Sequence, residues 1–555
     1  MNNNNTPISF SSLDRKKHLS SLQSQTFDLI VIGGGATGCG IALDAASRGM
    51  KTALIEKEDF ASGTSSKSTK LIHGGLRYLK QLEIGLVNET GTERAIVHKL
   101  APHLVLPEKM LMPIVENGTY GKLAASFGVM VYDILAGVRG DDRRKMLNKE
   151  ETLTIAPLLN PDTLKGGCYY AEYRTDDARL CIELAKSAVK FGCTAINYCE
   201  VEDFIYENGQ VKGVKCHDLL DKKYIIVQAQ QVVSAAGPWV DMLRKSDGSL
   251  GGKRLHLTKG VHIVVPRDKL PLNQSIYFNV PDGRMVFAIP RGRATYIGTT
   301  DTTYKGNKDR VLATKEDAEY LLKAIAHGFP TIEITLEDIE SNWAGLRPLI
   351  HEDGKSPSEL SRRDEIFESE SGLISIAGGK LTGYRKMAQR IVDKVNKRLA
   401  TDFGSCITKS IALGSKPMNS AQEVDQYIIH LEGEVSSLRL DAYHAWYLAT
   451  TYGKQSDLLI KYMSSNDLSG ETGLAKSEIW FAVHYEMVNS LEDFFVRRTG
   501  RLFFNILSVH QVRQVVTDDL AKYLKWNDQM KSSEIKRLDE HLHDATFYHE
   551  KELLS

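Results

Sequence analysis

Three glycines and one acidic residue near the start of the chain have the types and spacing of a dinucleotide site. Gly33, Gly35 and Gly38 follow a short apolar run, and Glu56 closes a second apolar run 18 residues after Gly38. Gly33 would allow a tight turn, Gly35 would let backbone N–H groups approach a pyrophosphate, and Gly38 would let a helix pack closely. A carboxylate at Glu56 would accept hydrogen bonds from a ribose and disfavour a 2′-phosphate, so FAD or NAD is expected rather than NADP. A structural βαβ unit without a ligand is the alternative.

Basic residues beside glycine turns or charged loops could bind an anion. These are Arg77, Arg347, Arg363 and Lys380, which are spread over about three hundred residues of the chain. If they converge, they form a compact cationic pocket suited to a phosphate dianion through charge-assisted hydrogen bonds. Taken singly, each is more typical of a surface charge, and the sequence alone does not show convergence.

An alcohol oxidation also needs a base for the hydroxyl proton, and histidine is the usual supplier near neutral pH. His262 lies in the apolar run GVHIVVP, where a satisfied core histidine is the more common interpretation. His73 is the competing candidate, although its place in a glycine loop favours a cofactor contact. The hydroxyls of Thr64, Ser65 and Ser68 precede it in a loop that could lie along a cofactor.

The elements that must position these residues are those of an α/β protein. Strand, helix and strand are expected over 28–32, 39–48 and 52–55, and the buried run 231–239 is expected to add a strand to the same parallel sheet. The first domain is therefore predicted to be discontinuous. A strand and a glycine turn precede a helix again over 373–399.

A second domain is indicated by β-like segments at short spacing, over 260–266, 275–278, 284–290 and 294–300, which favour an antiparallel sheet. The segment AGLRPLI is expected to bend at Gly345 and Pro348. The prediction is a Rossmann-like domain that binds FAD or NAD, a second domain with an antiparallel β-sheet, and a mostly helical C-terminal domain over 401–555. The dinucleotide-binding domain would comprise about 27–100, 170–250 and 365–400, and the second domain about 101–169 and 251–364.

Composition and charge set limits on partners. Lys plus Arg and Asp plus Glu number 70 each, so no global field would draw the protein to nucleic acid. The seven cysteines show no C-x-x-C spacing, so neither a disulfide framework nor a zinc site is expected, and no other metal site is predicted. The cytosol is therefore the simplest location.

Residues 1–26 lack a secretory signal and are interpreted as a flexible lead-in. The apolar stretch Leu123 to Gly137 is too short to span a membrane; it is interpreted as a core helix, with a segment at a membrane surface as the alternative.

Nine ordered segments carry a family resemblance: DLIVIGGGATGCGIALDAASRG, TSSKSTKLIHGGLRYL, APHLVLP, DDARL, AAGPWV, KGVHIVVP, IGTTDTTYKG, GLRPL and GGKLTGYRKMA. They resemble the FAD-dependent glycerol-3-phosphate dehydrogenases, the quinone-linked flavoenzymes of glycerol catabolism. The resemblance covers about residues 27–400 densely and the rest more loosely. It implies that the Rossmann-like domain is an FAD-binding domain and that the antiparallel β-sheet domain is a cap domain that binds substrate. It also implies oxidation of glycerol 3-phosphate and peripheral attachment to the cytoplasmic face of a membrane where quinone is reduced. A homodimer is also expected.

The resemblance assigns roles residue by residue. The glycine turn with Glu56 matches the site for the ADP half of FAD, and Val201 matches an adenine-side backbone contact. Further cofactor positions are Thr64, Ser65, Ser68, Lys70, Leu71, His73, Ala236, Gly237, Gly379, Lys380, Leu381 and Thr382. Positions that hold the phosphate and the reacting carbon are Arg77, Tyr78, His262, Arg347, Arg363 and Lys380, with His262 and Arg347 as the catalytic residues. Arg362 is adjacent to Arg363 and is the alternative there.

Both lines of reasoning give one hypothesis. The Arg and Lys cluster holds the phosphate of sn-glycerol 3-phosphate, His262 or a neighbouring group takes the C2 hydroxyl proton, and hydride passes from C2 to flavin N5, which leaves dihydroxyacetone phosphate. One alternative is an oxidase that passes the electrons to oxygen and forms hydrogen peroxide. Another is a non-catalytic dinucleotide-binding protein whose helical C-terminal region is a docking module.

Overall fold

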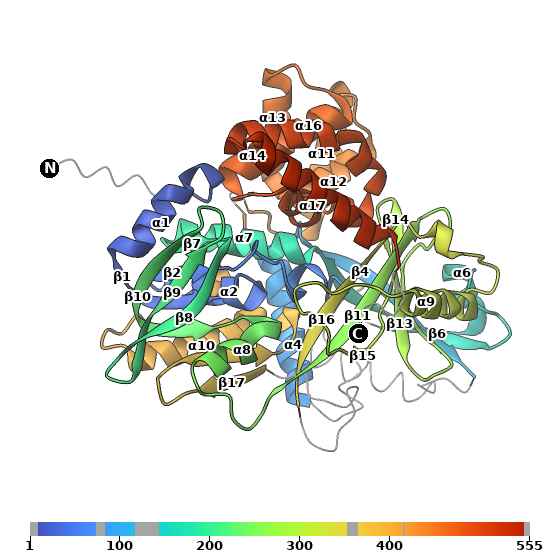
Figure 1. Ribbon diagram of the computed structural model, residues 1–555. Helices are drawn as coiled ribbons and strands as arrows, with labels where there is room; N and C mark the ends of the chain where they lie inside the picture. Colours follow the sequence, from blue (N-terminus) through green and yellow to red (C-terminus); the bar gives the residue numbers. More distant parts are fainter. Residues whose placement is uncertain (1–8, 74–83, 117–143, 352–363, 415–416, 549–555) are drawn as a thin grey trace.

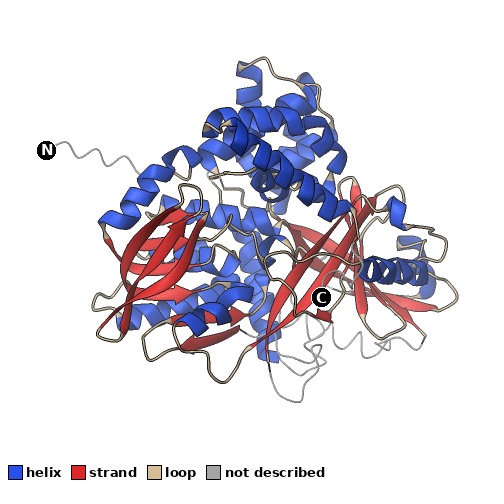
Figure 2. Cartoon of the chain, in the orientation of Figure 1, coloured by secondary structure: helices blue, strands red, loops and turns tan. Residues whose placement is uncertain are grey.

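The computed structural model describes residues 9–73, 84–116, 144–351, 364–414 and 417–548. Two β-sheets lie beside one another, and a cluster of C-terminal helices lies above them in the view of Figure 1. Figure 2 shows that strands are confined to the two lower bodies and that the upper body is helical. This is the α/β fold with a second sheet domain and a helical C-terminal domain that the sequence predicts.

The first sheet has the strand order β17-β18-β10-β1-β2-β7, with β9 pairing β10 and β8 pairing β9. Parallel pairs join β18, β10, β1, β2 and β7, so residues far apart in sequence form one sheet. The strands are β1 (Thr26–Ile32), β2 (Thr52–Ile55), β7 (Thr194–Ile196), β8 (Cys199–Glu207), β9 (Gln210–Asp218), β10 (Lys223–Ser234), β17 (Asp364–Glu368) and β18 (Ile374–Gly378).

Strand β1 shows why this sheet is buried on both faces. Leu29 and Val31 pack into one core with the helices α2, α7 and α10, while Ile30 and Ile32 pack into another with α1 and the β8–β10 layer. Successive side chains of a strand point to opposite faces, so an unbroken apolar run is required when both faces are covered. The helices around this sheet are α1 (Arg15–Ser24), α2 (Ala36–Ser47), α4 (Ile84–Leu100), α7 (Asp177–Lys190), α8 (Val240–Ser246) and α10 (Tyr384–Arg398).

The second sheet has the order β15-β11-β14-β13-β12-β4-β6-β3, with β16 pairing β11 and β5 pairing β6. Its pairs are antiparallel except for β12 with β4. The strands are β3 (Leu71–Ile72), β4 (Val105–Val115), β5 (Lys145–Leu147), β6 (Leu164–Thr175), β11 (Leu255–Pro266), β12 (Ser275–Asn279), β13 (Met285–Arg291), β14 (Ala294–Gly298), β15 (Thr302–Thr303) and β16 (Ser341–Ile350). Helices α6 (Lys149–Ile155) and α9 (Lys315–Gly328) belong to this domain, and the Thr314 side chain caps α9.

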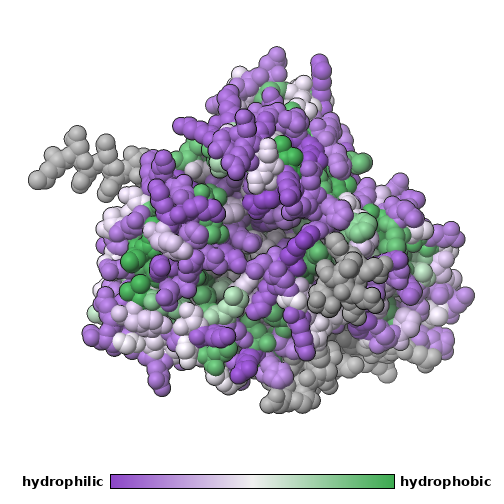
Figure 3. All heavy atoms as spheres, in the orientation of Figure 1, coloured by the Kyte–Doolittle hydropathy of each residue, from purple (hydrophilic) through white to green (hydrophobic). Residues whose placement is uncertain are grey.

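The C-terminal domain is helical, and its part from Ala475 onward packs against the face of the second sheet that carries Tyr296 and Trp343. Its helices are α11 (Ala421–Ser437), α12 (Ala442–Tyr452), α13 (Ser456–Ser465), α14 (Gly470–Tyr485), the π-helix η9 (Asp493–Arg498), α15 (Arg501–Phe504), α16 (Ile506–Leu524) and α17 (Asp528–Thr546). Hydrophilic residues cover most of their outer surface on the face seen in Figure 3. Of the helices that the structure describes, none combines the length and the apolar character needed to cross a membrane.

Two local predictions were wrong. The lead-in predicted to be flexible contains a 3-10 turn (Ser12–Asp14) and α1, because Arg15 forms a buried ion pair with Asp218 at 2.6 Å. The bend predicted in AGLRPLI is a continuous strand, β16. Among the residues that the structure describes, it pairs only with β11, so the missing N–H of Pro348 costs no ladder bond to another described strand. The stretch Leu123 to Gly137 lies outside the described residues.

Candidate active site

The carboxyl ends of four parallel strands of the first sheet meet at one cavity, which we call the cofactor cavity. The turns after β1, β2, β10 and β18 converge there, as open α/β sheets require of their ligand sites. The cavity measures about 300 Å³. Sequence-predicted residues that line it are Gly33, Gly35, Glu56, Thr64, Ser65, Ser68, Val201, Ala236, Gly237, Gly379, Lys380 and Leu381.

The glycine turn has the geometry that a pyrophosphate site needs. Gly33 adopts φ +107°, and a Cβ there would lie 2.6 Å from the carbonyl oxygen of Ala235. Gly38 lies behind the cavity: a Cβ on it would come within 1.8 Å of the Gly33 carbonyl oxygen, so only glycine lets α2 pack this closely. Gly35 is the N-cap of α2, and it makes no side-chain cap. The helix N-terminus therefore faces the cavity, which fits the phosphates of a dinucleotide.

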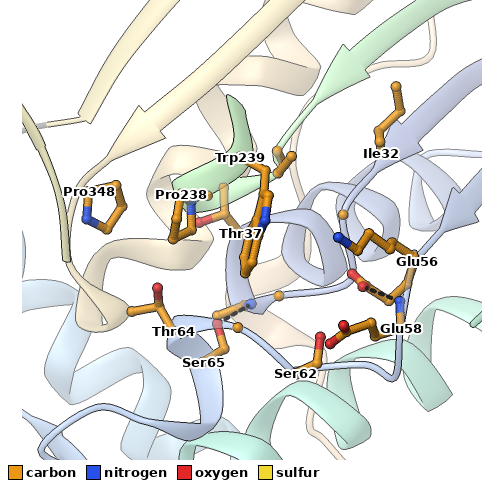
Figure 4. A pocket seen from close by; sticks show the side chains of 18 of the residues that line it. Ile32, Thr37, Glu56, Glu58, Ser62, Thr64, Ser65, Pro238, Trp239 and Pro348 are labelled. Carbon is orange, nitrogen blue, oxygen red and sulfur yellow. Dashed lines mark hydrogen bonds between the residues drawn. The ribbon is translucent and has the colours of Figure 1, made fainter. Parts of the chain in front are cut away.

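Glu56 lies beside this turn and is held in place by backbone donors. Its Oε2 accepts a hydrogen bond from Gly34 N at 2.6 Å, and its Oε1 accepts one from Glu58 N at 2.9 Å. Burial raises the pKa of Glu56 to about 7, although these two bonds act in the opposite direction. Figure 4 shows Glu56 and Glu58 at one side of the cavity, with Trp239 between them and Pro238 in that view. A ribose hydroxyl placed here would meet a carboxyl group, as expected.

The serine-rich loop after β2 closes the cavity from below in the view of Figure 4. Ser65 Oγ accepts a hydrogen bond from Ala36 N at 3.0 Å, which fixes the loop to the start of α2. Lys70 is buried beneath the loop and does not line either cavity. Its Nζ lies 2.5 Å from Asp177 Oδ1 and donates to the carbonyl oxygen of Ser66. Its side chain therefore anchors the loop in the described structure.

A second cavity of about 150 Å³ adjoins the first, and we call it the substrate cavity. Both cavities are lined by Thr64, Ser68, Pro348, Gly379, Lys380 and Leu381. The substrate cavity also contains Leu71, His73, His262, Arg347 and Thr382 from the predicted set. Thr382 Oγ1 donates to the carbonyl oxygen of His73 at 3.1 Å, which ties the turn after β18 to the loop after β3. The shared residues mark where a flavin ring would meet a substrate.

His262 on β11 is buried beside the substrate cavity. Its ring stacks on Trp343 with centroids 4.7 Å apart and planes 11° apart, and its Nε2 lies 3.0 Å from Thr69 Oγ1. A Cβ on the opposing Gly298 would lie 2.1 Å from the ring, so glycine makes room for it. Burial, and then the positive charges of Arg347 and Lys70, hold the pKa of His262 well below 6.5. The imidazole is therefore neutral and able to accept a proton at neutral pH.

Arg347 on β16 supplies a fixed cation to the same cavity. Its Nη2 donates to Thr299 Oγ1 at 2.8 Å, and its Nη1 donates to the Thr300 carbonyl oxygen and to Asp301 Oδ1, both at 3.1 Å. Gly260 of β11 allows this position, because a Cβ there would lie 2.5 Å from Nη2. Lys380 lines the cavity from the turn after β18. Two of the predicted basic residues, Arg347 and Lys380, thus line the substrate cavity together with His262.

Three predicted residues, Arg77, Tyr78 and Arg363, lie outside the described residues, as does the alternative Arg362. Sequence reasoning missed other lining residues, including Thr37, Glu58, Ser62, Thr69 and Trp239. A signal was available for Trp239, which directly follows the Gly237–Pro238 turn at the end of β10. No comparable signal marks Thr69, whose place depends on contact with a strand nearly 200 residues away.

Comparison with known proteins agrees with this geometry. Residues 28–385 match the family model described as FAD dependent oxidoreductase, and residues 374–531 match the C-terminal domain of alpha-glycerophosphate oxidase. The aerobic glycerol-3-phosphate dehydrogenase of Bacillus subtilis is 49% identical over 97% of this chain and 98% of its own. That of Staphylococcus aureus is 48% identical over 94% of this chain and 95% of its own.

Solved structures give the same result. The glycerol-3-phosphate dehydrogenase of Bacillus halodurans complexed with FAD is 43% identical, with a TM-score of 0.83 over 97% of this chain and 99% of that one. The L-alpha-glycerophosphate oxidase of Mycoplasma pneumoniae with FAD bound shares the fold at 19% identity, with a TM-score of 0.55 over 67% of this chain and 95% of that one. The cofactor is FAD, and the chain belongs to the aerobic glycerol-3-phosphate dehydrogenase family of FAD-dependent oxidoreductases.

Proposed function

We propose that this protein oxidises sn-glycerol 3-phosphate to dihydroxyacetone phosphate with FAD and passes the electrons to a membrane quinone while attached peripherally to the cytoplasmic face of the membrane. The observation that carries the proposal is the junction of the two cavities. A dinucleotide cavity opens onto a smaller cavity that holds Arg347, Lys380 and a neutral, buried histidine. The relatives that are 48–49% identical carry the same substrate in their names.

The residues of the substrate cavity divide the work between charge and proton transfer. Arg347 and Lys380 would bind the phosphate, and the bonds from Arg347 to Thr299 and Asp301 fix the guanidinium before substrate arrives. The C2 hydroxyl would then replace Thr69 as the partner of His262 Nε2, which takes the proton. Bound FAD supplies the acceptor for the hydride from C2. The stacked Trp343 holds the imidazole plane, so the proton acceptor stays aligned.

The cofactor positions are part of the same proposal. The turn from Gly33 to Gly38 and Glu56 would hold the ADP half of FAD. The loop from Thr64 to His73 and the turn from Gly379 to Thr382 line the junction and would flank the flavin. Arg77, Tyr78 and Arg363 remain proposed substrate contacts on the family resemblance alone.

Anaerobic mixing of the purified holoprotein with glycerol 3-phosphate tests the reaction. Bleaching of the oxidised flavin band, with dihydroxyacetone phosphate as the product, is expected. A yellow protein that does not bleach contradicts the substrate assignment and leaves the cofactor in place. Recovery of the band with a soluble quinone supports the dehydrogenase.

The site is tested by Arg347→Ala. Loss of a charge-assisted hydrogen bond of about 1.5–3 kcal/mol predicts a KM for glycerol 3-phosphate that rises roughly 10- to 150-fold. Arg293→Ala is the matched control, because Arg293 lies in the same domain with an exposed side chain paired at 3.8 Å to Asp441. An unchanged KM in Arg347→Ala would remove that residue from the phosphate site.

An oxidase is the second candidate, favoured by the match of residues 374–531 to the C-terminal domain of alpha-glycerophosphate oxidase. The dehydrogenation half would use the same residues, so only the electron acceptor differs. Reoxidation of the bleached protein by oxygen with stoichiometric hydrogen peroxide, and no faster reoxidation by quinone, would establish the oxidase instead.

A further inference from the structure

The glycine turn after β1 lies between two loops that carry side chains toward each other. In the first sheet β10 and β2 flank β1, so the loops that follow them lie on either side of Gly33. Lys57 follows β2, Trp239 follows β10, and both line the cofactor cavity. The ring of Trp239 also packs near Gly63, where a Cβ would lie 3.1 Å from it. A ligand above the glycine turn would therefore have Lys57 on one side and Trp239 on the other.

A residue of the cap domain joins these two sides. Asp309 Oδ1 accepts a hydrogen bond from Trp239 Nε1 at 3.0 Å and forms an ion pair with Lys57 Nζ at 2.7 Å. The ammonium group of Lys57 also lies 5.6 Å from the Trp239 ring centroid and 3.9 Å from Glu200. One carboxylate oxygen thus links the loops after β10 and β2. Its two partners, Lys57 and Trp239, both line the cofactor cavity.

The segment that presents Asp309 is ordered by its own contacts. It connects β15 to α9, and Asp309 N donates to Asn307 Oδ1 at 2.9 Å, while Tyr304 Oη donates to the Asn307 carbonyl oxygen at 2.7 Å. The next residue, Arg310, pairs with Asp544 of α17 at 2.8 Å. Adjacent residues of opposite charge therefore attach this cap segment to the FAD-binding domain and to the C-terminal helices. The backbone of Asp309 is therefore held by contacts that do not involve Lys57.

We propose that Asp309, Lys57 and Trp239 form a bridge over the cofactor cavity that gates the entry and release of FAD. The inference rests on the placement of FAD in this cavity and does not depend on which substrate is oxidised. The Asp309 side chain is 50% exposed and that of Lys57 is 33% exposed, so water competes for both groups and the bridge opens readily. It therefore sets the rates of FAD exchange and does not trap the cofactor permanently.

A gate and an affinity contact differ in their kinetics. Removal of a gate speeds binding and release of FAD together, whereas removal of a contact speeds release alone.

Three variants weaken the bridge to different degrees. Asp309→Ala removes both of its bonds, and Asp309→Asn keeps an acceptor oxygen for Trp239 but removes the charge that attracts Lys57. Trp239→Phe keeps an aromatic ring and removes the N–H donor. Lys305→Ala is the control, because it removes a charge from an exposed position of the same segment.

The measurement is FAD exchange with the purified full-length protein. Release is followed by the fluorescence of free FAD after dilution of the holoprotein, and binding by fluorescence quenching when FAD is added to the apoprotein. We expect both rates to rise about three- to tenfold in Asp309→Ala and less in Asp309→Asn and Trp239→Phe. Lys305→Ala should match the unaltered protein, and the melting temperature of every apoprotein should stay within about 2 °C.

Three results would overturn the proposal: unchanged rates in Asp309→Ala, faster release with unchanged binding, or a fall in the apoprotein melting temperature that accounts for the faster release. Failure of the proposed reaction gives a different result. If the protein binds FAD but does not oxidise glycerol 3-phosphate, the substrate assignment is wrong. The FAD exchange rates of the variants would still test whether the bridge acts as a gate.

Discussion

Among single residues, Glu56 is expected to couple FAD binding to pH. Burial raises its pKa to about 7 in the protein without ligand. Ribose hydroxyls that donate to the carboxylate would favour its ionised form and lower that pKa. FAD affinity should therefore increase as pH rises from 6 to 8 and weaken as pH falls below 7, with close to one proton released per FAD bound at pH 6. Calorimetry in buffers of different ionisation enthalpy measures that proton.

The matched variant is Glu56→Gln, which keeps an acceptor oxygen and does not titrate. It should bind FAD more weakly at pH 8 and lose the pH dependence between 6 and 8. An unaltered pH dependence in Glu56→Gln would mean that another group carries it.

His262 gives a second prediction at this scale. Burial and the charges of Arg347 and Lys70 keep its pKa well below 6.5, so the base is already deprotonated at pH 6.5 and is lost only at more acidic pH. The rate of anaerobic flavin bleaching should therefore show no decline from this group between pH 8 and 6.5. His262→Asn should slow bleaching by about 10²- to 10⁴-fold with the flavin spectrum retained. His256→Asn on the same strand is the control, and equal rates for the two variants would exclude His262 as the base.

Among the elements, those with local signals could be predicted and those fixed by distant partners could not. The β1–α2–β2 unit follows from apolar periodicity and glycine spacing, which are properties of neighbouring residues. Helix α1 was missed because its sequence is polar and its order comes from the contacts of Arg15 with the loop after β7 and with Asp218 of β9. Strand β16 was missed because Gly345 and Pro348 break strands in general and are tolerated here beside a single partner.

The same distinction applies to the site. The glycine turn is one continuous stretch, so its place could be predicted. His262 and Arg347 come together through the register of β11 with β16, which pairs Thr258 with Arg347 and His262 with Trp343. Lys380 arrives from the other sheet. Convergence of these three depends on how two sheets lie against each other, and single-sequence patterns do not contain that information.

The role of α1 can be tested through Arg15. Its guanidinium donates to Asp218 Oδ1 at 2.6 Å and to the carbonyl oxygens of Asn197 and Tyr198 at 2.6 and 3.2 Å. Arg15→Ala leaves a buried carboxylate without its cation, so the free energy of unfolding should fall by about 3–5 kcal/mol. Urea denaturation followed by circular dichroism measures this. Lys16→Ala, at an exposed position of the same helix, should change it by less than about 0.5 kcal/mol; equal effects would contradict the structural role of the ion pair.

At the scale of the whole molecule, a buried charge network joins the C-terminal helices to the loop that follows Glu56. Asp59 in this loop accepts hydrogen bonds from Arg497 Nε at 2.7 Å and from both terminal nitrogens of Arg498 at 2.7 and 2.9 Å. The loop also carries Glu58 and Ser62 to the wall of the cofactor cavity. The helical domain therefore contributes to the shape of that wall without lining the cavity itself.

This connection predicts that damage at Asp59 spreads to FAD binding. Asp59→Asn leaves the buried guanidinium group of Arg498 beside a neutral partner, whereas Arg497 keeps its ion pairs with Glu492 and Asp493. The change should cost about 3–5 kcal/mol of unfolding free energy and release the cavity wall. FAD affinity should fall about tenfold, and thermal unfolding should separate into two transitions, because the attachment of the helical domain to the cofactor loop through Asp59 is weakened. Glu423→Gln, which removes an ion pair to Lys454 within the helical domain, is the control and should preserve both properties. If Asp59→Asn lowers stability but leaves FAD affinity unaltered, the network serves only to hold the domains together. If both the stability and the FAD affinity fall, the C-terminal domain is one of the determinants of cofactor binding.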